Sequence, residues 1–115
     1  IIELYISDNI SNLGNNAFKN CSAINKLNLP ISLTPSNKSY DGTQPFYGCT
    51  NVDTVIFIND SIVRCPGGSA FQNTKIGNGV GFFYVKDSVL NDYLNDQGWS
   101  TIYPGQIRSI EDNLL

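Results

Sequence analysis

The sequence contains no histidine, and this absence limits its chemistry before any other feature does. Without histidine, serine and cysteine lack their usual general base, which argues against the common forms of nucleophilic catalysis. The three cysteines form no Cys-x-x-Cys pair, and their odd number excludes a fully paired disulfide framework. We therefore expect a protein that is not an enzyme, with no catalytic residues and no cofactor.

Charged residues are also scarce, at 15% of the chain with a net charge of -3. The seven Lys and Arg residues are scattered, whereas phosphate binding needs a clustered basic surface, so we expect no nucleic acid partner. No stretch approaches the roughly 18 to 20 apolar residues that span a bilayer, so we expect no membrane insertion. The first residue is not methionine, and Ile1-Ile2 is typical of the middle of a polypeptide. We expect upstream domains of the same polypeptide among the partners.

What the sequence does contain is a repeat. Each copy begins with an apolar-x-apolar pair: Leu4/Ile6, Leu27/Leu29, Val55/Phe57 and Phe83/Val85. In the first three copies a small residue and phenylalanine follow 14 to 19 residues later, at Ala17-Phe18, Pro45-Phe46 and Ala70-Phe71. A repeat of this length cannot bury its own apolar face, so neighbouring copies must stack. The pattern predicts an α/β solenoid with a short parallel β-sheet, one strand per repeat, and short helical turns and loops opposite.

The repeats divide a single domain over residues 1–110 into copies at 1–23, 24–51 and 52–76, followed by a different unit at 77–110 and a tail at 111–115. Asp87-Ser88 is placed to begin a helix whose apolar face carries Val89, Leu90, Tyr93 and Leu94, and Gly98 is placed to end it. Solenoids need an atypical terminal unit to shield their last core layer. We therefore predict a helical cap at the C-terminal end.

The cysteines occupy related positions, because Cys21 and Cys49 each follow a repeat phenylalanine by three residues. Stacking favours a buried column of small side chains, with Cys65 as a further core thiol. A Cys21–Cys49 bridge stays open if their Cα atoms fall within about 7 Å. Asp8, Asp60 and Asp87 follow strands at similar places, but Ile31-Ser32 interrupts the series, so turn capping is favoured over a metal site.

These residues resemble the BspA-type leucine-rich repeat family of bacterial and protist surface proteins. The resemblance is carried by Ile10-x-x-Leu13-Gly14-x-x-Ala17-Phe18-x-x-Cys21, by Ile24-x-x-Leu27-x-Leu29-Pro30 and by Phe46-x-x-Cys49-x-x-Val52-x-x-Val55-x-Phe57. It implies a leucine-rich-repeat fold and a noncatalytic interaction module, extracellular or on the cell surface and linked to adhesion. It brings no ligand-binding residues with it.

Candidate contact residues follow from the strands themselves. If each apolar pair faces the core, the residue between its members faces outward. Stacking then aligns Tyr5, Asn28, Ile56 and Tyr84 in one column, with Phe82 in the next column. Because neighbouring strands lie about 4.8 Å apart, Ile56, Ile58, Phe82 and Tyr84 are expected to form an apolar and aromatic surface.

A second candidate is the loop around Tyr40, which makes the second copy longer than the first. The function we predict is a noncatalytic surface or secreted module that binds a protein or host-surface ligand, with a role in cell adhesion. The alternative is a structural spacer or terminal cap within a larger surface or virion-associated assembly.

Overall fold

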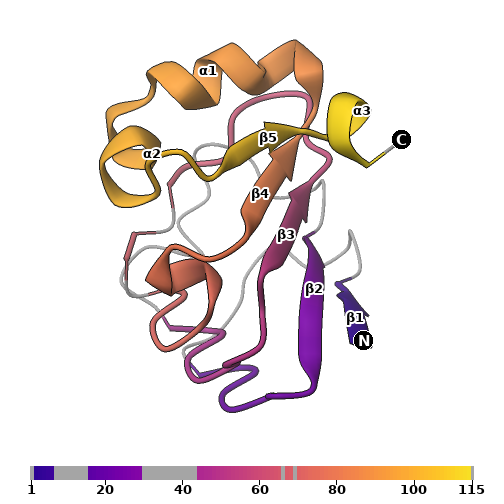
Figure 1. Ribbon diagram of the computed structural model, residues 1–115, viewed down its shortest axis with the longest axis vertical. Helices are drawn as coiled ribbons and strands as arrows, with labels where there is room; N and C mark the ends of the chain where they lie inside the picture. The colour runs from indigo at the N-terminus through magenta and orange to yellow at the C-terminus, as the bar shows by residue number, and fades with distance from the viewer. Residues whose placement is uncertain (1, 7–15, 30–43, 66, 69, 115) are drawn as a thin grey trace.

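The computed structural model describes residues 2–6, 16–29, 44–65, 67–68 and 70–114 of the chain. Among these residues, five strands form one sheet in chain order, from β1 at one edge to β5 at the other (Figure 1). The strands are β1 Ile2–Tyr5, β2 Ile24–Leu29, β3 Thr54–Phe57, β4 Phe82–Val85 and β5 Ile107–Ser109. Every neighbouring pair is parallel, as the repeat predicted for the first four strands.

Alternation along the strands decides which side chains enter the core. The apolar pairs of β2, β3 and β4 are buried on one face, and their exposed fractions do not exceed 3%. Leu4 and Ile6 of the first repeat are only partly buried against the same core. The pairing places Leu27 beside Val55 and Val55 beside Phe83, so the predicted register is confirmed.

Phenylalanine rings stack on the side of the core opposite the sheet. Phe18, Phe46 and Phe71 lie in successive turns, with neighbouring ring centroids 5.6 Å apart and ring planes within 7° of parallel. Phe46 and Phe71 are fully buried. The backbone N–H of Phe18 donates to the carbonyl of Pro45 at 2.8 Å, which ties the first of these turns to the second. The predicted stacking of the three small residue–phenylalanine turns is therefore confirmed.

The position three residues after each stacked phenylalanine holds Cys21, Cys49 or Thr74, and the last two are buried. Cys49 is buried, and its thiol donates to the carbonyl of Phe18 at 3.0 Å. Thr74 occupies the same place one repeat later, and its hydroxyl donates to the carbonyl of Phe71 at 2.7 Å. Burial raises the pKa of the Cys49 thiol. A short side chain that can donate a hydrogen bond suits this place: Cys49 donates to the preceding turn and Thr74 to its own turn.

The other two cysteines are only partly buried, which corrects the expectation of three core thiols. Cys21 lies in the first described turn, where no further described repeat packs beyond it. Cys65 lies beside Gly98, at the edge of the core. None of the three cysteines forms a disulfide, so the bridge left open between Cys21 and Cys49 is not formed in this structure.

The C-terminal region has several short helices. They are η1 Ile76–Asn78, η2 Asp87–Val89, α1 Leu90–Asn95, α2 Gln97–Ile102 and α3 Ile110–Asn113. The single helix expected up to Gly98 is wrong, because α1 already ends at Asn95. Asp96 then caps α2 by accepting a hydrogen bond from the backbone N–H of Trp99. Gly98 lies inside α2, and Leu94 is 49% exposed, so neither has the predicted role.

A cluster of aromatic side chains joins this region to the third repeat. Trp99, Tyr93 and Tyr103 are buried and contact Phe57 or Phe83 of the sheet, mostly edge to face. The indole N–H of Trp99 donates to the carbonyl of Val63 at 2.9 Å. The backbone N–H of Val63 in turn donates to the Tyr93 hydroxyl at 2.8 Å. These contacts hold the segment around Val63 against α1 and α2.

Candidate functional site

The outward face of the sheet carries the contact residues that the sequence predicted. Tyr5 pairs with Asn28, Asn28 with Ile56, and Ile56 with Tyr84, which forms the expected column. The neighbouring column consists of Glu3, Lys26, Thr54 and Phe82. Because α1 and α2 pack on the inner face through Tyr93 and Trp99, the helices do not cover these columns. The structure thus gathers five of the six predicted residues on one face.

The end of this face at β1 and β2 is polar. The Glu3 carboxylate accepts a hydrogen bond from the side-chain amide of Asn28 and lies 3.8 Å from the ammonium of Lys26. The pKa of Glu3 is lowered, most strongly by a hydrogen bond from the Tyr5 hydroxyl and less strongly by Asn28 and Lys26. The same bond raises the pKa of Tyr5, whose side chain is 72% exposed. Hydrogen bonds therefore restrain the Glu3 and Asn28 side chains before any ligand arrives.

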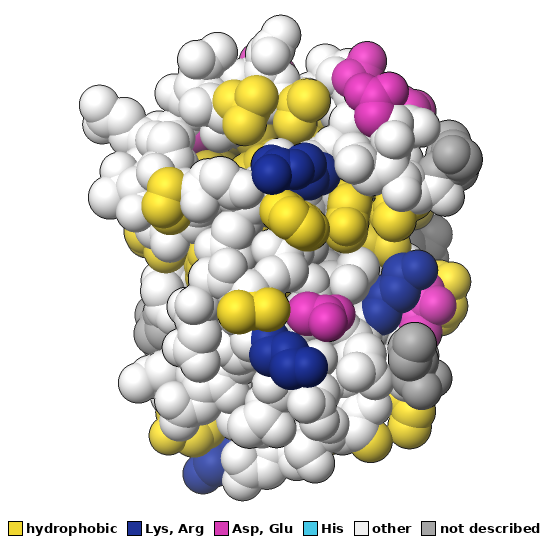
Figure 2. Space-filling model, viewed as in Figure 1, with side chains coloured by type: hydrophobic (Ala, Val, Ile, Leu, Met, Phe, Trp, Pro, Cys, Tyr) yellow, Lys and Arg dark blue, Asp and Glu magenta, His cyan; other side chains and the backbone are white. Residues whose placement is uncertain are grey.

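The opposite end, at β4 and β5, is aromatic and basic. The rings of Phe82 and Tyr84 meet edge to face with centroids 6.1 Å apart. The guanidinium of Arg108 lies over the Phe82 ring, 4.5 Å from its centroid. It also donates to the carbonyls of Gly105 and Ile107, both at 3.0 Å, which restricts its position. Figure 2 shows apolar side chains gathered beside a basic group over β4 and β5.

We call the group formed by Ile56, Ile58, Phe82, Tyr84 and Arg108 the aromatic patch. Ile58 is 47% exposed, whereas Ile56 is only 7% exposed although its strand position faces outward. Ile56 lies in register between Asn28 and Tyr84, so it contributes to the floor of the patch more than to its accessible surface. An ion pair between Lys86 and Asp60, with an N–O distance of 2.6 Å, lies among the charged groups at the ends of β3 and β4.

One predicted residue is not described by the structure, and one residue of the patch was not predicted. Tyr40 lies outside the residues that the structure describes, so its predicted role stays a prediction. Arg108, in contrast, was not predicted, although its pairing with Tyr84 extends the central column by one strand. The only sequence signal was the short alternation Ile107-Arg108-Ser109, which lacks the repeat phenylalanine and any second apolar residue.

The side chains on the outward face of the sheet are of kinds that bind other molecules through noncovalent contacts. No three or more Cys, Asp or Glu side chains come together in the described part of the chain in a way that would hold a metal ion. No helix in the same part has the length and apolar character needed to cross a bilayer. Aromatic rings, a restrained guanidinium and hydrogen-bonded polar groups on one face are suited to bind another molecule.

Comparison with known families identifies the repeat. Residues 1–82 match a family model described as a BspA type leucine rich repeat region of six copies. The chain belongs to the BspA-type leucine-rich repeat family. Neither the comparison with curated proteins nor that with solved structures gave a match. Since leucine-rich repeats are in general noncatalytic and mediate protein interactions, family membership agrees with the open sheet face.

The family match ends at the first residue of β4. It therefore includes β1, β2, β3 and the three stacked phenylalanines, while α1, α2 and β5 lie beyond it. The aromatic patch draws on both parts, because Ile56, Ile58 and Phe82 come from the matched residues and Tyr84 and Arg108 follow them.

Proposed function

We propose that this chain is a noncatalytic protein-binding module of a surface or secreted protein and that it acts in cell adhesion. The proposal rests on the register of β3, β4 and β5, which brings Phe82, Tyr84 and Arg108 onto one outward face. Tyrosine and arginine are enriched among the few residues that carry most of the free energy of protein association. A partner with acidic and apolar side chains would match Arg108 and the exposed Ile58.

The contact surface we propose includes Tyr5, Asn28, Ile56, Phe82 and Tyr84, with Tyr40 as a further contact. Tyr5 and Asn28 would supply hydrogen bonds to a partner from side chains whose positions their bonds to the Glu3 carboxylate already restrain. The rings of Phe82 and Tyr84 would supply apolar area. Restrained side chains lose little conformational entropy when a partner binds, which supports this surface as a binding site.

The architecture we propose for this function is a short solenoid of stacked copies at 1–23, 24–51 and 52–76, closed by residues 77–110 as a terminal cap. The contacts of Trp99 and Tyr93 with the segment around Val63 support the closing role. The same contacts favour the alternative function, a spacer or terminal cap in a larger surface or virion-associated assembly. In that case the buried contacts of Trp99 and Tyr93 would matter for assembly, and the exposed side chains of the aromatic patch would not.

The test is a binding screen against a panel of extracellular and host-surface proteins, followed by a double substitution in the aromatic patch. We expect Ile58→Asp with Tyr84→Asp to weaken binding by about 1,000-fold, because such central contacts carry about 2 kcal/mol or more each. The control is Leu94→Asp, which places one of the two charges on an apolar side chain of α1 whose exposure is similar to that of Ile58. Retained affinity in the double variant, with circular dichroism unchanged, would remove the patch as the binding site.

A further inference from the structure

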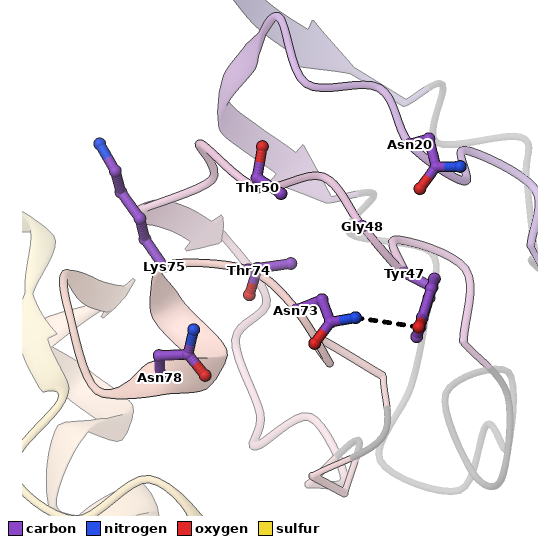
Figure 3. Close-up of a pocket in the computed structure, with 8 residues that line it drawn as sticks. All are labelled: Asn20, Tyr47, Gly48, Thr50, Asn73, Thr74, Lys75 and Asn78. Carbon is purple, nitrogen blue, oxygen red and sulfur yellow. Dashed lines mark hydrogen bonds between the residues drawn. The ribbon is translucent and has the colours of Figure 1, made fainter.

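A second surface lies on the side of the molecule opposite the sheet, over the stacked turns. There a hollow of about 550 Å³ opens between three successive turns of the chain (Figure 3). Its described lining consists of Asn20, Tyr47, Gly48, Thr50, Asn73, Thr74, Lys75 and Asn78. This volume falls within the range of small-molecule sites, roughly 300–1,000 Å³. The aromatic patch contributes no residue to it, so the two surfaces are independent.

One position in the repeat, two residues after each stacked phenylalanine, supplies three of the residues that line the hollow. Asn20, Gly48 and Asn73 occupy this position and all have positive φ, at 61°, 76° and 60°. Asparagine and glycine are the residues that adopt this conformation most readily. The middle copy has glycine, and a Cβ there would lie 2.1 Å from Oδ1 of Asn20. The absence of a side chain on Gly48 therefore lets the Asn20 amide lie against the backbone of the next turn, at one side of the hollow.

Hydrogen bonds already orient part of this lining. The side-chain amide of Asn73 donates to the Tyr47 hydroxyl at 2.9 Å, which links two successive turns. The hydroxyl of Thr74 donates to the carbonyl of Phe71 and accepts from the backbone N–H of Gly77, so it is engaged within the protein. Asn20, Asn73 and Asn78 are all exposed residues. The lining thus presents several donors and acceptors at once.

The charge of the hollow is positive. Lys75 is exposed and forms no ion pair with the described carboxylates, and none of the eight lining residues is acidic. A second ammonium, that of Lys19, lies 5.8 Å from the ring centroid of Tyr47. In the view of Figure 3, Lys75 and Asn20 stand on opposite sides of the hollow. A ligand that spans it would meet an amide at one side and a cation at the other.

We propose that this hollow binds an acidic saccharide. Small-molecule sites are commonly lined by apolar side chains, so a lining of amides, hydroxyls and one ammonium selects a ligand rich in hydroxyl groups. Asn20, Asn73 and Asn78 would bond the hydroxyls, because each amide offers a donor and an acceptor side by side. Lys75 would bind the carboxylate. Tyr47 would contribute its aromatic ring and its hydroxyl group to the contact.

The experiment is a titration of the 115-residue chain, labelled with ¹⁵N, with methyl β-glucuronide and with methyl β-glucoside. The two probes differ only in the carboxylate. We expect saturable shift changes at the side-chain amides of Asn20, Asn73 and Asn78 and at the backbone N–H of Gly48. The glucuronide should bind about tenfold more tightly than the glucoside, the difference that one charge-assisted hydrogen bond provides.

Two variants assign the contacts. Lys75→Gln should reduce the affinity for the glucuronide to that for the glucoside. Asn73→Asp keeps the size and the tolerance of positive φ and can still bond the Tyr47 hydroxyl, but it should weaken glucuronide binding at least tenfold through repulsion. Its matched control is Gln72→Glu, which adds the same charge one residue away, outside the lining, and can still accept from the Gln44 amide.

Three results would overturn the proposal. The first is the absence of saturable shifts with either probe up to tens of millimolar. The second is equal affinity for the two probes, which would remove the role of Lys75 and the acidic class of ligand. The third is a set of shifts at Tyr84 and Arg108 in place of the hollow, which would assign saccharide binding to the sheet face.

Discussion

The stacked repeats and the C-terminal region build their shared core in two different ways. In the repeats, equivalent rings lie parallel, as in the pair Phe46 and Phe71, whose planes differ by 6°. In residues 83–114 the rings of Trp99 and Tyr103 meet Phe83 edge to face, at angles of 72° and 62°. Parallel rings follow when the same turn is repeated along the chain. Edge-to-face rings come from different side chains, each of which packs with its own geometry.

This difference extends to hydrogen bonds. Between the repeats, the backbone itself links successive turns, as from Asn20 N–H to the carbonyl of Tyr47 at 2.8 Å. In the C-terminal region, side chains reach to the backbone of the third repeat, as from the Tyr103 hydroxyl to Gly67 at 2.6 Å and from the Gln106 amide to Ile76 at 2.9 Å. The repeats therefore distribute their stability over equivalent contacts, while the C-terminal region depends on a few individual side chains.

The strongest test of this comparison is Trp99→Ala. Trp99 is fully buried and contacts Phe57, Phe83, Tyr93 and Tyr103, so its removal leaves a large cavity and an unpaired carbonyl at Val63. We expect a loss of about 4 to 5 kcal/mol in the free energy of unfolding, measured by urea denaturation with circular dichroism. Trp99→Phe keeps a ring but not the N–H and should lose about half as much. Equal stability of Trp99→Ala and the natural chain would refute the dependence on single side chains.

A smaller effect is expected within the phenylalanine stack, and it should depend on position. Phe46 has a ring on each side and is fully buried, so Phe46→Ala should cost about 3 to 4 kcal/mol. Phe18 has one described ring neighbour and is half-buried, so Phe18→Ala should cost about 1 to 2 kcal/mol. Both values come from the same denaturation experiment. A cost for Phe18 that equals or exceeds the cost for Phe46 would contradict the layer-by-layer distribution of stability.

A third effect concerns pH and involves a buried tyrosine of the C-terminal region. Burial raises the pKa of Tyr93 to about 12 from its ordinary value of 10.0. Because folding favours the neutral phenol, the contribution of Tyr93 is complete below pH 10 and is lost as pH rises through about 12. The free energy of unfolding should fall by about 2 to 3 kcal/mol over this interval on account of Tyr93.

Denaturation at a series of alkaline pH values measures this slope. Tyr93→Phe removes the ionisable group, so its stability should fall less steeply between pH 10 and 12 than that of the natural chain. Tyr47→Phe, at a half-buried position outside the aromatic cluster, serves as the control. Identical slopes for Tyr93→Phe and the natural chain would show that Tyr93 ionises as readily in the folded as in the unfolded protein.

The sequence predicted the repeated part of the fold well, because repetition reveals register. Once Leu27, Val55 and Phe83 are recognised as equivalent, the pairing of their strands and the outward position of Asn28, Ile56 and Tyr84 follow. The C-terminal region has no second copy for comparison. Its helix was therefore extended to Gly98 from local pattern alone, and β5 was not found.

The candidate site shows the same limit. The outward direction of Ile56 was predictable from alternation, but its 7% exposure depends on neighbouring side chains that alternation does not describe. Arg108 depends on the pairing of β4 with a three-residue strand, a contact between segments without shared sequence features. The hollow beside Tyr47 is lined by residues of three turns together, which the pattern of a single repeat does not reveal.

The phenylalanine stack also has a consequence for protein engineering. From the first core residue of each strand to its ring, the chain takes 14 residues between Leu4 and Phe18, 19 between Leu27 and Phe46, and 16 between Val55 and Phe71. The rings nevertheless keep the same 5.6 Å spacing. The interval between strand and ring thus varies in length by five residues (19 against 14) while the spacing of the rings stays the same. A foreign epitope grafted into it should leave the scaffold intact.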